Sequence, residues 1–171
     1  MAMNTRLVSH LRSNQVSRVV YGSIIGLALI LTLEAHPPEV TERSRAAVVI
    51  GTMLATALAV ALAELYSELV GARTRAGMGG STEPLGTVVG NSAAVAFGIA
   101  LPAVFFVAVA LNLIDYDTAF ALAKWTGLGL IAAYGYIAAR LSGAGTSAAL
   151  LQASFVALIA ATLIVLKAFV H

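Results

Sequence analysis

The stretch AAVVIGTMLATALAVALAELYSELVG, residues 46–71, decides the class of this protein. It contains no charged residue before Glu64, and it is longer than the roughly 20 apolar residues that an α-helix needs to cross the hydrocarbon core of a bilayer. We therefore interpret residues 46–71 as a transmembrane helix.

The composition of the whole chain agrees with this interpretation. Of its 171 residues, 60% are hydrophobic and 11% are charged, with a mean hydropathy of +0.92, whereas soluble domains contain about 25% charged residues. The formal net charge of +2 comes from dispersed residues, so no nucleic-acid partner is expected. The absence of cysteine excludes disulfides and thiolate metal sites, and no resident cofactor is predicted.

Four further apolar stretches flank residues 46–71, and turn-forming prolines and glycines separate them. Pro102 falls inside one of these stretches, where it is expected to bend the helix. The sequence predicts an all-α polytopic membrane protein that forms a single domain, residues 1–171, in the lipid bilayer. Its five transmembrane helices would occupy about residues 19–35, 46–71, 86–113, 118–141 and 146–169.

The first 18 residues are basic, with Arg6, Arg12 and Arg18 ahead of the first apolar stretch. We interpret residues 1–18 as an interfacial helix in the headgroup layer, with a frayed basic tail as the alternative. The loop cations place the N-terminus in the cytoplasm, because positive residues in short loops stay on that side. Five spans then put the C-terminus on the opposite side, and we expect an integral protein of the bacterial inner (plasma) membrane.

Small residues recur at helical spacing on the first two predicted spans. Such residues allow two helix backbones to approach closely in lipid. Two interpretations stay open, namely packing within one subunit and the seam of a homodimer. The residues concerned are Gly22 and Gly26 in the first span and Ala55, Ala59 and Ala63 in the second.

Two carboxylates, Glu64 and Glu68, lie one helical turn apart near the predicted cytoplasmic end of the second span. Two acids on one helix face favour a shared proton or a bound cation, and hard divalent ions prefer oxygen ligands. Glu64 and Glu68 are therefore candidate metal ligands. In the alternative interpretation both acids reach the headgroup layer and meet Arg73, Arg75 or water.

Tyr66 and Asn91 are candidates for a polar path, but the favoured interpretation of Asn91 is a hydrogen bond to a neighbouring helix. The sequence contains no phosphate-binding loop and no pairing of a nucleophile with a base that matches a known motif. We therefore do not expect an enzyme.

Several short motifs resemble those of the vacuolar iron transporter family, whose members have five spans, form dimers and exchange ferrous iron or manganese for protons. The resemblance implies a dimeric divalent-cation transporter with Glu64 as a ligand, and Glu68 is a local candidate to assist it. The motifs are Val20-Tyr21-Gly22 with Gly26-Leu27, Ala63-Glu64 with Tyr66-Ser67, Leu101-Pro102, and Ala139-Arg140-Leu141-Ser142-Gly143.

The sequence also departs from that family. Ile25 stands where the family has an aspartate, and Leu65 separates the glutamate from the tyrosine that follows it directly in the family. An isoleucine cannot coordinate an ion. Two other functions therefore remain alternatives to metal–proton exchange: a non-transporting membrane scaffold or accessory subunit on the same fold, and a passive ion channel.

Overall fold

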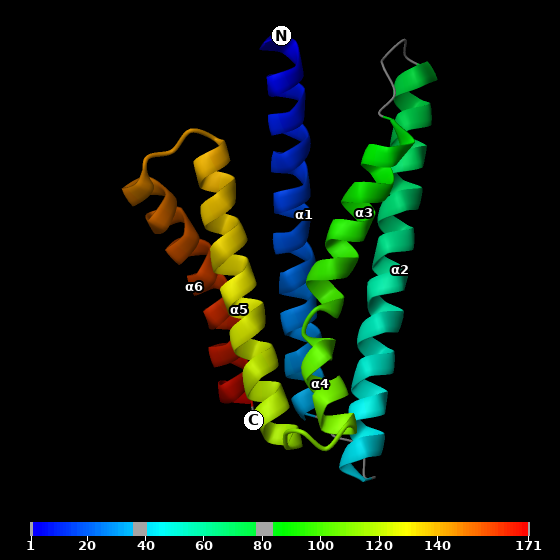
Figure 1. Cartoon of the computed structure of the whole chain (residues 1–171), viewed down its shortest axis with the longest axis vertical. Helices are drawn as coiled ribbons and strands as arrows, with labels where there is room; N and C mark the ends of the chain where they lie inside the picture. The colour runs from blue at the N-terminus through cyan, green and yellow to red at the C-terminus, as the bar shows by residue number, and fades with distance from the viewer. Residues whose placement is uncertain (1, 36–40, 78–83, 171) are drawn as a thin grey trace.

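The computed structural model describes residues 2–35, 41–77 and 84–170, and in these residues it contains helices and no strands. This confirms the predicted all-α class. Figure 1 shows the chain running up and down the bundle. The six helices are α1 (Ala2–Ala35), α2 (Glu42–Gly77), α3 (Leu85–Ala100), α4 (Ala103–Ala110), α5 (Tyr116–Leu141) and α6 (Thr146–Val170).

Two helical segments are long and apolar enough to cross a membrane: Gln15–Ala35 of α1 and the whole of α2. The bent pair of α3 and α4 qualifies as a third when its two parts are taken together. Over the residues described, α5 and α6 do not reach the same standard, and α5 carries Lys124 and Arg140. The predicted count of five spans is therefore not confirmed, whereas two to three are supported.

The predicted bend at Pro102 is confirmed. The α3 and α4 axes differ by 48° across Leu101–Pro102. The N–H of Leu101 still donates to the carbonyl oxygen of Phe97 at 3.0 Å, but the proline nitrogen has no hydrogen to continue the series. The predicted span 86–113 is thus two helices joined at an angle.

Residues 2–18 of the basic segment form the first half of α1 without a break, and their position in the headgroup layer stays a prediction. The predicted turns on either side of α2 fall largely on residues 36–40 and 78–83, which lie outside the described residues. Of the glycines assigned to the second turn, Gly77 is the last residue of α2.

The helix α1 forms the centre of the bundle (Figure 1). It packs mainly against α3 and α5, whereas α2 packs against α3 and α4, and α6 packs mainly against α5. The start of α1 and the end of α6 lie at opposite ends of the bundle (Figure 1). Successive helices alternate in direction, with α3 and α4 running the same way (Figure 1).

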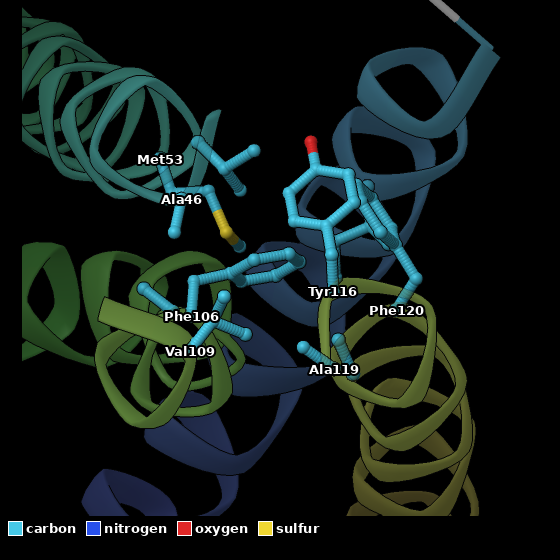
Figure 2. Packing of buried hydrophobic residues seen from close by; sticks show 11 residues of the cluster. Ala46, Met53, Phe106, Val109, Tyr116, Ala119 and Phe120 are labelled. Carbon is cyan, nitrogen blue, oxygen red and sulfur yellow. The ribbon is translucent and has the colours of Figure 1, made fainter. Parts of the chain in front are cut away.

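The largest buried cluster lies at the end of the bundle where α2 and α5 begin (Figure 2). The rings of Phe106, Tyr116 and Phe120 meet edge to face, with centroids 4.8–6.1 Å apart, and Met53 of α2 belongs to the same cluster. Edge-to-face geometry is favourable for aromatic quadrupoles. This cluster ties α2, α4 and α5 together.

Asp115 caps the N-terminus of α5 next to this cluster. Its carboxylate accepts hydrogen bonds from the backbone N–H of Thr118 at 2.7 Å and from the Thr118 hydroxyl at 2.8 Å. These bonds, the backbone one first, hold the pKa of Asp115 below its ordinary value of 3.8. The helix therefore begins with one of its free N–H groups satisfied.

Candidate ionic site

Three charged side chains from α1 and α2 meet in one cluster. The guanidinium of Arg18 contacts Glu64 through Nη1, and Nη2 donates to Oε1 of Glu68 at 2.6 Å. The side chains are 26% exposed for Arg18 and 17% exposed for each glutamate. We refer to Arg18, Glu64 and Glu68 together as the ionic cluster.

The geometry of the ionic cluster follows from two helical features. Glu64 and Glu68 share a face of α2 because they are four residues apart, and Arg18 reaches them from α1. The helices α1 and α2 otherwise touch little, since α3 packs between them. Arg18 therefore provides a polar link between two helices that the apolar packing leaves apart.

The cation that meets the glutamates is not one of those suggested by the sequence. Arg73 and Arg75 lie on the exposed last turns of α2, whereas Arg18 is 50 residues away from Glu68 in the chain. Sequence spacing could not reveal this pairing, because it depends on how α1 and α2 are arranged around α3. The sequence feature that could have indicated this pairing is Arg18 itself, because it directly precedes the first apolar stretch.

A second ion pair marks the other end of α1, where Nζ of Lys124 on α5 donates to Oε1 of Glu34 at 2.6 Å. Arg18 and Glu34 are sixteen residues apart, which corresponds to about 24 Å along a helix. No charged residue lies between them in α1. This separation is close to the roughly 30 Å thickness of a hydrocarbon core, so the ionic cluster is expected near one membrane boundary.

Asn91 lies on the face of α3 that turns toward α1 and α2. It is fully buried, and neither atom of its amide has a hydrogen-bond partner within the described part of the chain. The bond to a neighbouring helix that the sequence suggested is therefore not formed. One turn further along α3, Val95 packs on Gly22, and Gly22 is itself one turn beyond Arg18. Helical register thus places Asn91 at about the depth of the ionic cluster.

Tyr66 does not join Asn91 in a polar path. Its side chain is 71% exposed on the outside of α2, whereas Asn91 is buried. Because Tyr66 comes two residues after Glu64, it lies about 200° around the helix from the glutamate, on nearly the opposite face. Ile25, at the position of the family aspartate, is partly buried against the apolar side chains of Ala57, Val95 and Ile99.

Gly22 and Gly26 of α1 allow close helix packing within one subunit. A Cβ at Gly22 would lie 2.9 Å from the carbonyl carbon of Val95, and one at Gly26 would lie 3.1 Å from Cα of Ile99. Both glycines therefore form the crossing with α3, as small residues do in membranes. In contrast, Ala55, Ala59 and Ala63 are exposed on α2, so their role in a homodimer seam stays a prediction.

The described residues contain no group of three or more His, Cys, Asp or Glu side chains that could hold a metal ion. Metal binding by Glu64 and Glu68 stays a prediction. The ionic cluster holds two carboxylates and one guanidinium, so with both acids ionised it carries one excess negative charge. Comparison of the chain with protein families, with curated proteins and with solved structures gives no match.

Proposed function

We propose that this chain is a five-span membrane transporter that exchanges a divalent cation, iron(II) or manganese(II), for protons at the ionic cluster. The observation that carries the proposal is the meeting of Arg18, Glu64 and Glu68 inside a bundle of apolar helices. Two carboxylates on one helix face favour a shared proton or a bound cation, and a position near a membrane boundary gives cations access to them. The resemblance of the second span to the vacuolar iron transporter family supports the same assignment for Glu64.

Charge counting suggests how the exchange would proceed. With Arg18 in place, the one excess negative charge can be neutralised by a single proton. A divalent cation would be neutralised by both carboxylates only after Arg18 leaves, because like charges repel in a partly desolvated site. Arg18 is 26% exposed, and its long side chain can move toward the headgroup layer. Arg18 would therefore occupy the cation position whenever cargo is absent.

Neighbouring groups would complete the coordination of such a cation. Two glutamates supply too few oxygens for a hard divalent ion, which usually takes six or more. The amide oxygen of Asn91, at about the same depth and without a hydrogen bond, is the protein oxygen that we assign to this role. Water would supply the remaining ligands.

The proposal also includes the finer features of topology and assembly. We propose that α5 and α6 cross the bilayer as the fourth and fifth spans, with the N-terminus in the cytoplasm of a bacterial cell. We further propose a homodimer that uses the exposed stripe Ala55, Ala59 and Ala63 of α2. Support for these features comes from the distribution of charges and small residues in the sequence.

Transport is tested with the purified chain in liposomes, by following manganese(II) or iron(II) uptake under a pH gradient. We expect Glu64→Gln and Glu68→Gln to abolish uptake, while Glu42→Gln, which removes an exposed acid from the start of the same helix, leaves it unchanged. Arg18→Gln should instead bind manganese(II) more tightly, because the competing cation is gone. Uptake that is indifferent to Glu64→Gln would refute the assignment.

A second candidate function is a non-transporting membrane scaffold or accessory subunit. The observation that favours it is the apolar packing of Ile25 against Ala57, Val95 and Ile99, where an ion site would need an oxygen ligand. In that case the ionic cluster would only fasten α1 to α2. The liposome assay distinguishes these functions, because a scaffold gives no flux, and a passive channel gives conductance without proton coupling.

A further inference from the structure

A cavity of about 370 Å³ lies between α1, α3 and α5. Small residues on α3, Gly90 and Ala94, create the space, and Val16 and Val19 of α1 form the wall opposite them. Figure 1 shows α5 diverging from α1 toward the end where α1 begins. The cavity therefore opens where the two helices separate.

The depth of the cavity can be read from its lining. On α1 the lining residues Gln15, Val16 and Val19 lie within one turn of Arg18. On α5 the lining runs from Tyr134 to Leu141, which corresponds to about 10 Å along the helix axis. The cavity thus lies at about the depth of Arg18, which is expected near a membrane boundary, and its α5 wall reaches inward to Tyr134.

The chemistry of the lining restricts what can bind there. Apart from the amide of Gln15 and the hydroxyl of Tyr134, the lining side chains that the structure describes are apolar, and none of these is charged. The volume would hold about twelve waters, at roughly 30 Å³ each, but water needs two or more polar partners to be stable in such a space. An apolar chain fits these walls better than water, a metal ion or a nucleotide.

A cation lies beside the mouth of the cavity. Arg140 precedes the lining residue Leu141 and is exposed, and its guanidinium donates to the carbonyl oxygen of Ala144 at 3.2 Å and to the hydroxyl of Thr146 at 3.3 Å. It is therefore held at the start of the turn between α5 and α6. A cation fixed beside an apolar cavity at a membrane boundary suits a lipid with a negatively charged headgroup.

We infer that this cavity binds one acyl chain of an anionic phospholipid, with the headgroup phosphate near Arg140. The upper part of the acyl chain would lie against Val16, Val19 and Ala94, and the part further from the headgroup would reach Tyr134. This inference does not depend on the transport proposal, because no residue of the ionic cluster is among the described lining residues of the cavity.

The test uses the purified chain reconstituted in vesicles that contain equal amounts of phosphatidylglycerol and phosphatidylcholine, followed by detergent extraction and native mass spectrometry. We expect retained phosphatidylglycerol on the wild type and at least a tenfold lower retention for Ala94→Phe, about the factor that follows from losing roughly two buried methylene groups. The matched control is Ala93→Phe, on the exposed face of the same helix. Arg140→Gln should retain both lipids equally.

A photoactivatable phosphatidylglycerol with its reactive group in the acyl chain provides a measurement that needs no variant. Crosslinks should concentrate on residues 15–19, 90–94 and 134–141. Crosslinks spread evenly over the outside of the bundle would overturn the inference. So would equal lipid retention by Ala94→Phe and Ala93→Phe, because the cavity would then hold only exchangeable detergent.

Discussion

The crossing of α1 and α3 predicts a large effect of a single methyl group at Gly98. A Cβ built at this position lies 2.6 Å from the carbonyl oxygen of Val19 and 2.6 Å from the backbone nitrogen of Ser23. Both are main-chain atoms of α1, so no side chain can rotate to make room. Ordinary contact begins at 3.4 Å, and Gly98→Ala must therefore separate the two helices by 3.4 − 2.6, or about 0.8 Å.

Separation of this size disturbs the contact of α1 with α3 along the length of the crossing. Inserting one carbon into a well-packed interior destabilises a protein by about 1–3 kcal/mol. A matched control is Gly129→Ala, because a Cβ at Gly129 has no atom within 4 Å. Both substitutions add the same helix propensity, so the difference between the two variants isolates the steric effect.

The free energy of unfolding can be measured by SDS titration of the purified protein in detergent micelles, with far-UV circular dichroism as the signal. We expect Gly98→Ala to be less stable than Gly129→Ala by about 1–3 kcal/mol. Gly26→Ala, with its closest contacts at 3.1 Å, should fall between them. A difference below about 0.5 kcal/mol, the usual effect of a surface substitution, would refute the close approach of the two helices.

Three further predictions use the same unfolding assay. Phe106→Ala should destabilise the protein by about 3–5 kcal/mol, because the ring is fully buried, while Phe97→Ala, at 45% exposure, should have a far smaller effect. A double-mutant cycle of Lys124→Met and Glu34→Gln should give a coupling below about 1 kcal/mol that falls with added salt, since both side chains are partly exposed. The lowered pKa of Asp115 predicts stabilisation that is fully present above about pH 3.8 and is lost as the pH falls through the lower pKa of the folded state. Asp115→Ala should therefore be less stable at neutral pH and should show a weaker loss in acid, and an unchanged acid profile would contradict this origin.

Apolar stretches and turn residues predict the helices well, because both are local features of the sequence. The predicted stretches 118–141 and 146–169 correspond to α5, Tyr116–Leu141, and α6, Thr146–Val170. The kink at Pro102 was also predictable, since a missing N–H acts within one turn. The continuity of α1 was not predicted, because polar residues are compatible with either a helix or a tail.

Contacts between distant helices could not be predicted in the same way. Glu64 and Glu68 were recognisable as a pair because they are one turn apart, but their partner Arg18 is defined by packing around α3. The partner of Gly22 and Gly26 could not be predicted either. Small residues indicate that another helix backbone approaches closely, but they do not identify that helix. The structure identifies that backbone as α3.

The central position of α1 has a consequence for biogenesis. This helix is synthesised before α2, whereas its main neighbours, α3 and α5, are synthesised after α2. Before α3 and α5 are made, the face of α1 that carries Gly22 and Gly26 contacts lipid or the insertion machinery. The first contact that α1 can make with another helix is then the ionic attraction between Arg18 and the two glutamates of α2. In a chain truncated after α2, the ionic cluster should therefore be the main contact between α1 and α2, and we expect such a chain to be degraded readily.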